Sequence, residues 1–195
     1  MQEFYDTYLQ IPSSRERRDS LNEQMSIFET QNLSCRKCIG NCCTFTSNSM
    51  MITPIEAFDI LSFLMKSKDF RQGDLIESLQ ETINEFRLDQ NSTGIRKTYT
   101  CPFYTGESKG CTISKHSKPY GCLAFLPSET NIKKGTSCLS KIDSLVSREK
   151  VFGKKENLTN ELLISELNLS WKKLSIPEAV LDIIKKGEHL LSPKL

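Results

Sequence analysis

The residues with the clearest chemical potential are eight cysteines, all of which lie between residues 35 and 138. Four of them form the closely spaced cluster C-x2-C-x3-C-C, which consists of Cys35, Cys38, Cys42 and Cys43. Gly40 and Asn41 can adopt the turn conformations that let the sulfur atoms converge. A short loop of this kind brings thiolates within about 2.3 Å of a metal, and it suits a zinc knuckle or an iron-sulfur site.

Cys42 and Cys43 are adjacent in the sequence, which bears on the number of sites. Neighbouring side chains point to different sides of a locally extended backbone. We therefore expect these two cysteines not to bind one ion together. On this hypothesis the loop is shared between two sets of ligands.

The other four cysteines are more widely spaced, and three of them stand beside a turn-forming residue. The set comprises Cys101 before Pro102, Cys111 after Gly110, Cys122 after Gly121, and Cys138. Four plus four thiolates are suggestive of two tetrathiolate sites for Zn²⁺. A single [4Fe-4S] cluster held by four cysteines would leave the other four for zinc or for structure, and the sequence leaves this choice open.

The rest of the composition favours reduced thiols in the cytoplasm. The N-terminal residues MQEFYDTYLQ lack the basic start and apolar run of an export signal, and no apolar stretch approaches the ~18 residues of a membrane span. A disulfide framework is therefore a weaker hypothesis, as is a set of buried cysteines acting only as small apolar residues. The formal net charge of +2 comes from interspersed Lys and Arg, so we expect neither a nucleic-acid nor a membrane partner.

The elements expected around the cysteines are mostly helices. We predict a mainly α-helical single small domain with irregular, cysteine-rich loops organised by metal, and with little β-structure. Its expected parts are an N-terminal helical extension over residues 1–34, a metal-binding region over 35–140 and a helical C-terminal tail over 141–195. A helical face formed by Leu21, Met25 and Phe28 follows a charged run at residues 15–19.

Two further helices are predicted in the middle of the chain. Thr53, Pro54 and Glu56 provide an N-cap, a proline at the first helical position and a capping-box glutamate. A second amphipathic run follows Gly73 and contains Leu75, Leu79, Ile83 and Phe86. We expect these two helices to be antiparallel and to pack over the cysteine loop.

The second half of the chain is predicted to be irregular first and helical later. From Asn91 to Lys155 it breaks into short pieces rich in Gly, Pro, Ser and Lys, with one or two short strands. Helical character returns after Lys155, and a last helix is predicted from Pro177 to Gly187.

Other side chains have weaker claims on a metal. His116 lies between two cysteines, but its Ser and Lys neighbours favour a solvated loop, and His189 has no other candidate ligand near it in sequence. We expect Lys109, Lys115 and Lys118 to offset the charge of the thiolates. Aromatic residues are expected to wall the site from water, namely Tyr99, Phe103, Tyr104, Tyr120 and Phe125.

In their order along the chain, these motifs resemble the bacterial and archaeal cysteine-cluster family that is named for a CxxCxxCC signature and described as a zinc- or iron-chelating domain. The first four cysteines match the opening cluster of the family. The later matches are Cys101-Pro102-Phe103, Gly110-Cys111-Thr112-Ile113, Pro119 with Cys122, the segment with Phe125, Pro127 and Ser128, and Cys138. The resemblance covers about half of the chain and implies that the cysteines bind metal.

The family includes flagellin lysine N-methylases, so the resemblance implies a possible enzyme as well. That alternative is an iron-sulfur enzyme which methylates a protein lysine with S-adenosylmethionine. A redox or metal-handling protein is a third class, and the expected partners are metal ions and a protein partner or protein substrate. The chain departs from the family pattern by one extra residue in the opening cluster, by Lys118 where arginine is usual and by Ser114 where an aromatic residue is common.

Overall fold

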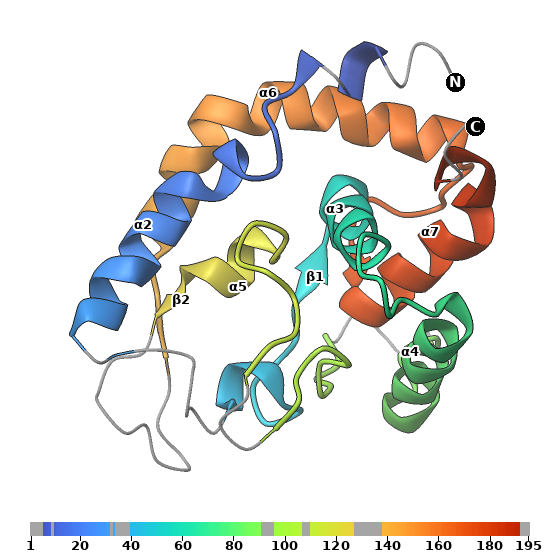
Figure 1. Cartoon of the computed structure of the whole chain (residues 1–195), viewed down its shortest axis with the longest axis horizontal. Helices are drawn as coiled ribbons and strands as arrows, with labels where there is room; N and C mark the ends of the chain where they lie inside the picture. The colour runs from blue at the N-terminus through green and yellow to red at the C-terminus, as the bar shows by residue number, and fades with distance from the viewer. Residues whose placement is uncertain are drawn as a thin grey trace.

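The computed structural model describes residues 6–8, 10–31, 33, 40–90, 96–106, 110–126 and 138–191, with no side chains described for residues 188–191. The helices among these residues are α2 (Glu16–Thr30), α3 (Pro54–Leu64), α4 (Gln72–Phe86), α5 (Tyr120–Ala124), α6 (Ile142–Glu166) and α7 (Ile176–Leu191), and a 3-10 turn, η1, covers Asn41–Cys43. The predicted mainly helical, single-domain fold is confirmed (Figure 1).

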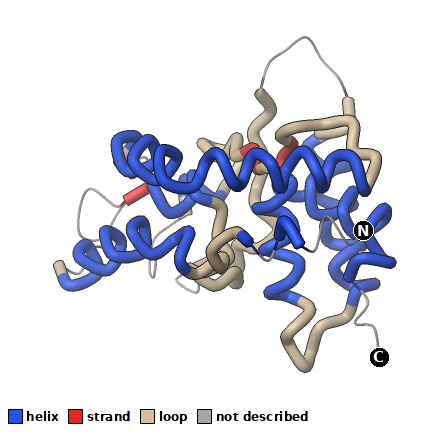
Figure 2. The backbone as a smooth tube through the Cα atoms, turned by 90° about the horizontal axis from the view of Figure 1, so that it is seen from above, coloured by secondary structure: helices blue, strands red, loops and turns tan. Residues whose placement is uncertain are grey.

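The strands are short and pair elements that are distant in sequence. Strand β1 (Met51–Ile52) pairs antiparallel with β4 (Leu174–Ser175), and β2 (Phe125–Leu126) pairs antiparallel with β3 (Leu139–Ser140). Figure 2 shows these strands as small pieces among the helices. They join loops to the helical core instead of forming a sheet with a core of its own.

Helix α3 begins as the sequence predicts and lies at the centre of the main core. Thr53 and Glu56 form the capping box, and the backbone N–H of Thr53 donates to the carboxylate of Glu56 at 2.9 Å. Ile55, Ile60 and Leu61 are fully or almost fully buried. Helices α3 and α4 both pack against α7, so the expectation that they form a pair over the cysteine loop is wrong. Helix α7 offers both of them a continuous apolar surface.

Helix α6 begins at Ile142, so the prediction of irregular structure up to Lys155 is wrong. The helix shows no simple apolar stripe up to Glu156, because the positions buried there are Arg148, Gly153 and Glu156. Helix α6 packs against α2 and α3, and Figure 1 shows it as the long helix along one edge of the molecule.

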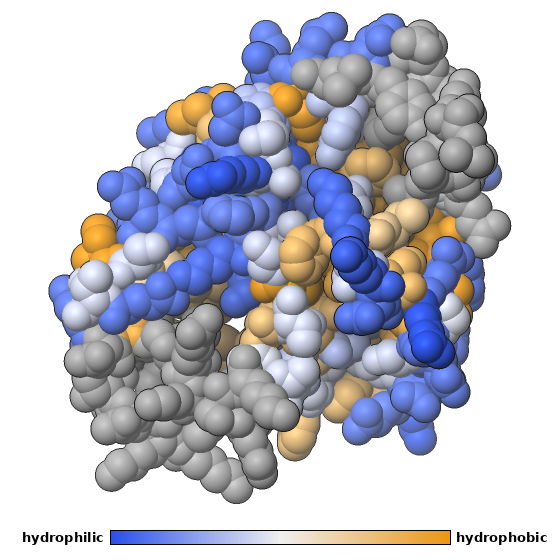
Figure 3. All heavy atoms as spheres, in the orientation of Figure 1, coloured by the Kyte–Doolittle hydropathy of each residue, from blue (hydrophilic) through white to orange (hydrophobic). Residues whose placement is uncertain are grey.

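Helix α7 also exceeds its predicted length, because it continues through Gly187 to Leu191. An added Cβ at Gly187 would meet the side chain of Leu167 at an ordinary contact distance of 3.6 Å. The glycine is therefore a packing position and not a helix end. None of the described helices combines the length and apolar character needed to cross a membrane. In the space-filling view the described surface is mostly hydrophilic, with small separated apolar groups (Figure 3).

Candidate metal centre

Six of the eight cysteines belong to the described part of the chain. They are Cys42, Cys43, Cys101, Cys111, Cys122 and Cys138, and none of them forms a disulfide with another described cysteine. Cys35 and Cys38 lie outside the described residues, as does Lys109. The described part of the centre therefore comprises the second half of the opening cluster and the later cysteines.

Gly40 starts the turn that carries the first two of these cysteines. Its φ of +70° is left-handed, and the N–H of Cys43 donates to its carbonyl at 2.7 Å. A Cβ at this position would lie 2.3 Å from the ring of Tyr104. Both the backbone conformation and the close approach of Tyr104 require glycine here.

Cys42 and Cys43 present their sulfur atoms to each other, because the backbone at this point is a 3-10 turn and not extended. The two Sγ atoms lie 4.0 Å apart. A tetrahedral ion with bonds of about 2.3 Å holds neighbouring sulfurs ~3.8 Å apart. The expectation that these side chains point to different sides is wrong, since its premise of extended backbone does not hold.

Backbone hydrogen bonds attach this turn to the segment around Cys101. The N–H of Cys101 donates to the carbonyl of Cys43 at 2.7 Å. The buried amide of Asn48 donates to the carbonyl of Tyr99 at 3.0 Å, and the N–H of Tyr99 donates to the carbonyl of Asn48 at 2.9 Å. These bonds fix the register between two parts of the chain that are more than fifty residues apart.

A small hairpin brings Cys111 back towards Cys101. Tyr104 and Cys111 form an isolated antiparallel bridge, and the N–H of Thr112 donates to the carbonyl of Phe103 at 2.9 Å. Gly110 has a φ of +77° at the return of this hairpin. The turn-forming glycine seen in the sequence thus serves to place a thiol.

Five cysteines line one cavity of about 50 Å³, which we call the thiol cavity. They are Cys42, Cys43, Cys101, Cys111 and Cys122, and the remaining wall includes Gly40, Tyr104, Lys118, Phe125 and Ile176. Cys138 instead lines an adjoining groove of about 180 Å³, which it shares with Cys42. The structure therefore brings most of the described cysteines together and places Cys138 at the edge.

The surroundings of the thiols separate their acidities. Burial raises the pKa of Cys101 to about 12 and that of Cys122 well above its ordinary value. Hydrogen bonds from Cys138 and then from Cys43 lower the pKa of Cys42 to about 3, and the same bond to Cys42 raises the pKa of Cys43. The hydrogen bond between the adjacent pair thus makes Cys42 the more acidic of the two thiols.

The donors fit zinc or iron, although they are not gathered into a finished shell. Among the described residues, no three Cys, His, Asp or Glu side chains are arranged as a ready metal site. The cavity is nevertheless lined by sulfur and by no carboxylate, and thiolates select zinc or iron-sulfur clusters over hard cations such as Mg²⁺. Cys42 and Cys43 already have the spacing of two ligands of one tetrahedral ion.

The histidine and lysines have the following places. His116 is exposed, and its Nδ1 lies 3.3 Å from the side-chain nitrogen of Asn22, away from the residues that line the thiol cavity. Lys115 forms an ion pair with Glu29 at 2.6 Å. Lys118 lines the cavity, where its charge opposes the effect of burial on the pKa of Cys122. The side chain of His189 is outside the described residues.

Of the five aromatic residues expected around the cysteines, two line the thiol cavity. These are Tyr104 and Phe125. Tyr99 is buried beside the cavity, where its hydroxyl donates to the carbonyl of Met50 at 2.7 Å and accepts from the N–H of Ile176 at 3.0 Å. Phe103 belongs to the main core.

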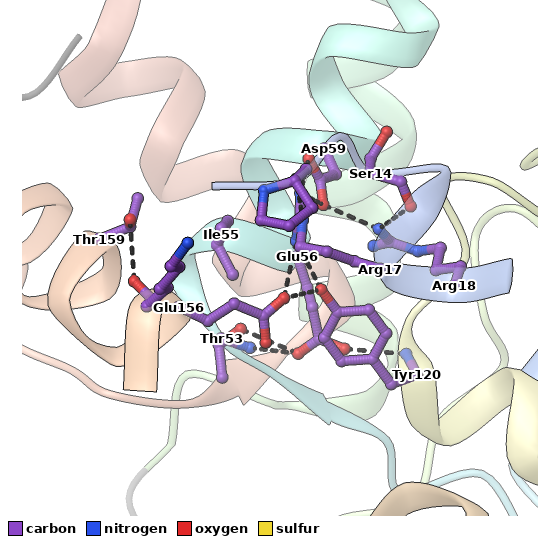
Figure 4. A network of polar contacts seen from close by, with 12 residues as sticks. Ser14, Arg17, Arg18, Thr53, Ile55, Glu56, Asp59, Tyr120, Glu156 and Thr159 are labelled. Atoms are coloured by element: carbon purple, nitrogen blue, oxygen red, sulfur yellow. Dashed lines mark hydrogen bonds and ion pairs between the residues drawn. The ribbon is translucent and has the colours of Figure 1, made fainter. Parts of the chain in front are cut away.

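A buried ion-pair network behind Cys122 was not predicted from the sequence. It consists of Arg17, Arg18, Asp59, Tyr120, Arg148 and Glu156, as Figure 4 shows in part. In the sequence, residues 15–19 are simply a charged run before a helical face. Arg18 nonetheless precedes Leu21 and Met25 by three and seven residues, which is the spacing of one helical face and was the signal available.

Comparison with known proteins gives one match. The family sequence model CxxCxxCC, whose description reads "Putative zinc- or iron-chelating domain", matches residues 34–139. No curated protein and no solved structure matches the chain significantly. Every cysteine, described or not, falls within the matched range. Because the match spans more than half of the 195 residues, the chain belongs to the CxxCxxCC family of zinc- or iron-chelating domains.

Proposed function

We propose that this protein binds zinc through its cysteines and that the ion organises the irregular segments between residues 35 and 140. The observation that carries the proposal is the thiol cavity, into which three separate segments of the chain bring five cysteines. Convergence of five thiols from distant segments on one cavity is what a bound ion requires, because its ligands must be brought together as thiolates.

The geometry favours zinc over a [4Fe-4S] cluster. Two thiolates on one tetrahedral ion are ~3.8 Å apart, and the sulfurs of Cys42 and Cys43 are separated by 4.0 Å. In a [4Fe-4S] cluster each cysteine binds a different iron and points to a different corner, which holds the sulfurs farther apart. A cavity of about 50 Å³ also suits an ion better than a cube of eight atoms.

The eight cysteines divide into two sets on this proposal. Four of the five in the thiol cavity bind one ion. The fifth joins Cys35, Cys38 and Cys138 as the four thiolates of a second ion. A bound ion would link segments that are distant in sequence through its four thiolate ligands. The chain would orient and bury those thiolates, and the positive charge of Lys118 would offset part of their negative charge.

Titration of the metal-free protein with cobalt(II), under anaerobic conditions, tests this proposal. Cobalt(II) bound by four thiolates gives intense visible bands that octahedral cobalt(II) lacks, so the absorption reports both geometry and number of ions. We expect saturation at two ions per chain and displacement of both by zinc. Weak absorption typical of oxygen ligands, or no saturation, would show that the cysteines do not form tetrathiolate sites.

A second candidate function, metal handling, is favoured by the groove that adjoins the thiol cavity. Cys42 and Cys138 both line a space of about 180 Å³, which is more than the 150 Å³ or so that admits a benzene-sized molecule. An external thiol can therefore approach Cys42. Rapid zinc transfer to a small thiol chelator would support this function, whereas exchange over many hours would support a structural ion.

A further inference from the structure

We propose that the buried ion-pair network positions the segment from Lys118 to Cys122 at the thiol cavity, with Arg18 as the main positioning residue. Docking of helix α2 and metal binding are then coupled, although no described residue of α2 lines the cavity. The part of this inference that concerns metal rests on the proposed function. The part that concerns the thiol of Cys122 does not.

Arg18 connects three parts of the molecule from a fully buried position. Its Nε donates to the carbonyl of Lys118 at 2.6 Å. One Nη donates to the carbonyl of Ser14 at 3.0 Å and to the carboxylate of Asp59 at 3.0 Å. Helix α2, helix α3 and the segment before α5 therefore meet at a single guanidinium. Figure 4 shows Arg18 with Ser14 and Asp59.

Tyr120, two residues before Cys122, is held from several directions. Its N–H donates to the carboxylate of Glu56 at 2.9 Å. Its hydroxyl donates to Glu156 and accepts from Arg17. Its ring lies between two guanidinium groups, with Arg148 at 3.2 Å and Arg18 at 4.6 Å from the ring centroid. Such contacts fix a backbone position and not merely a buried volume.

Helix α5 needs this external support because it has only five residues. A helix of that length does not form by itself in water. One end of the segment carries Lys118 and the other carries Cys122, and both side chains line the thiol cavity. The network thus acts on the cavity through the backbone of a segment that cannot hold its own shape.

The chemistry of the network also indicates a positioning role. Buried ion pairs contribute little to stability compared with apolar residues of the same size, because both partners lose their hydration. Arg18 even retains one Nη without a hydrogen-bond partner in the described part of the chain. What distinguishes this arrangement from an apolar core is that its hydrogen bonds select one orientation of the Lys118 carbonyl and of Tyr120.

Coupling follows from the same contacts and must be reciprocal. A metal ion that requires Cys122 in place favours the conformation in which Lys118 accepts from Arg18. Docking of α2 in turn restrains Cys122 before the ion binds.

The experiment compares Arg18→Met with Leu163→Ala, a variant in the main core that leaves the network untouched. Metal-free full-length proteins are treated with iodoacetamide, and modification of Cys122 is followed by mass spectrometry of its peptide. We expect Cys122 to react at least tenfold faster in Arg18→Met than in wild type, with partial rescue in Arg18→Lys, which keeps a charge and a donor. Leu163→Ala, at an equal loss of thermal stability, should leave that rate within twofold of wild type.

Cobalt(II) affinity supplies the second readout. Arg18→Met should bind cobalt(II) at least tenfold more weakly than Leu163→Ala. If Arg18→Met does not fold, Tyr120→Phe decides the question, because it keeps the ring and removes only the hydroxyl bonds to Glu156 and Arg17. An unchanged labelling rate of Cys122 in the folded variant would overturn the inference. Absence of metal binding in wild type would instead overturn the proposed function and leave the labelling result valid.

Discussion

The Sγ atoms of Cys42 and Cys43 lie 4.0 Å apart on a 3-10 turn whose first carbonyl belongs to a left-handed glycine. The two adjacent sulfurs therefore have the spacing of two thiolates on one tetrahedral ion. Cys101 is fixed to the same turn by the hydrogen bond from its N–H to the carbonyl of Cys43. The opening cluster and the later cysteines thus belong to one structural unit.

Replacement of Cys43 by serine should remove the ion of the thiol cavity. We expect zinc affinity at that site to fall more than about 100-fold, since loss of residues that merely orient a ligand already costs about 10- to 100-fold. Cys138→Ser is the matched control, because Cys138 lines the groove and not the cavity. Competition with a zinc-binding dye measures both. Equal loss of the cavity ion in the two variants would contradict the assignment.

Gly40→Ala should be much more harmful than Gly106→Ala. Both positions have a left-handed φ, of +70° and +67°, so alanine costs about 1–2 kcal/mol of backbone strain at either one. Only at Gly40 would the new methyl group collide with Tyr104, whereas Gly106 has open space. Thermal unfolding and zinc content of the two variants separate the backbone strain, which both share, from the steric clash with Tyr104, which only Gly40→Ala has. A Gly40→Ala protein as stable and as well loaded as Gly106→Ala would refute the close approach.

The sequence predicts well those features that depend on neighbouring residues. The capping box of Thr53 and Glu56, the apolar face of Leu21 and Met25 and the turn at Gly40 all follow from local rules. The family match over residues 34–139 likewise follows from the order of the cysteine motifs.

The features that sequence reasoning missed depend on contacts between distant segments. Arg148 and Glu156 look like solvated charges in α6, yet they are buried because Arg17 and Tyr120 meet them from elsewhere in the chain. These buried charges also conceal the start of α6 at Ile142. The orientation of Cys42 and Cys43 required knowledge of a turn that contacts with Tyr104 stabilise.

Zinc binding should release protons, and its affinity should rise with pH. The raised pKa values of Cys101 and Cys122 keep both thiols neutral in the metal-free protein at pH 7, whereas bound zinc requires thiolates. Each such thiol makes the apparent affinity about tenfold weaker for every unit by which pH falls. Calorimetry in buffers of different ionisation enthalpy counts the protons. Cys42, whose pKa is already lowered in the metal-free protein, should contribute no proton to that count.

Acid should destabilise the protein through Glu156. Burial raises the pKa of this carboxyl, but the hydrogen bond and charge of Arg148 outweigh burial, and the pKa is lowered from 4.5. The resulting stability is present above pH 4.5 and is lost as pH falls through the lower folded value. Glu156→Gln should lose about 3–5 kcal/mol at pH 7 and show a flatter acid dependence. Denaturant unfolding at several pH values measures both effects, with the exposed Glu161→Gln as the control variant. Equal free energies of unfolding for the two variants at pH 7 would show that the network does not stabilise the protein.

Removal of metal should loosen the cysteine region and spare the helical core. The main core around Ile60, Leu163 and Val180 is apolar and needs no ion to form. After chelation, limited proteolysis should cut between residues 40 and 50 or between 96 and 126, while α3, α6 and α7 survive. Cleavage equally distributed along the chain would show that the core also depends on metal, and cleavage unchanged by chelation would show that no ion organises the region.

The most direct test of zinc binding is metal analysis of the protein purified without oxygen, together with its visible absorption spectrum. We predict a colourless protein that carries stoichiometric zinc, because the spacing of Cys42 and Cys43 and the small thiol cavity suit a tetrahedral ion. Broad visible absorption with iron and labile sulfide would contradict this prediction and assign an iron-sulfur cluster to the cysteines.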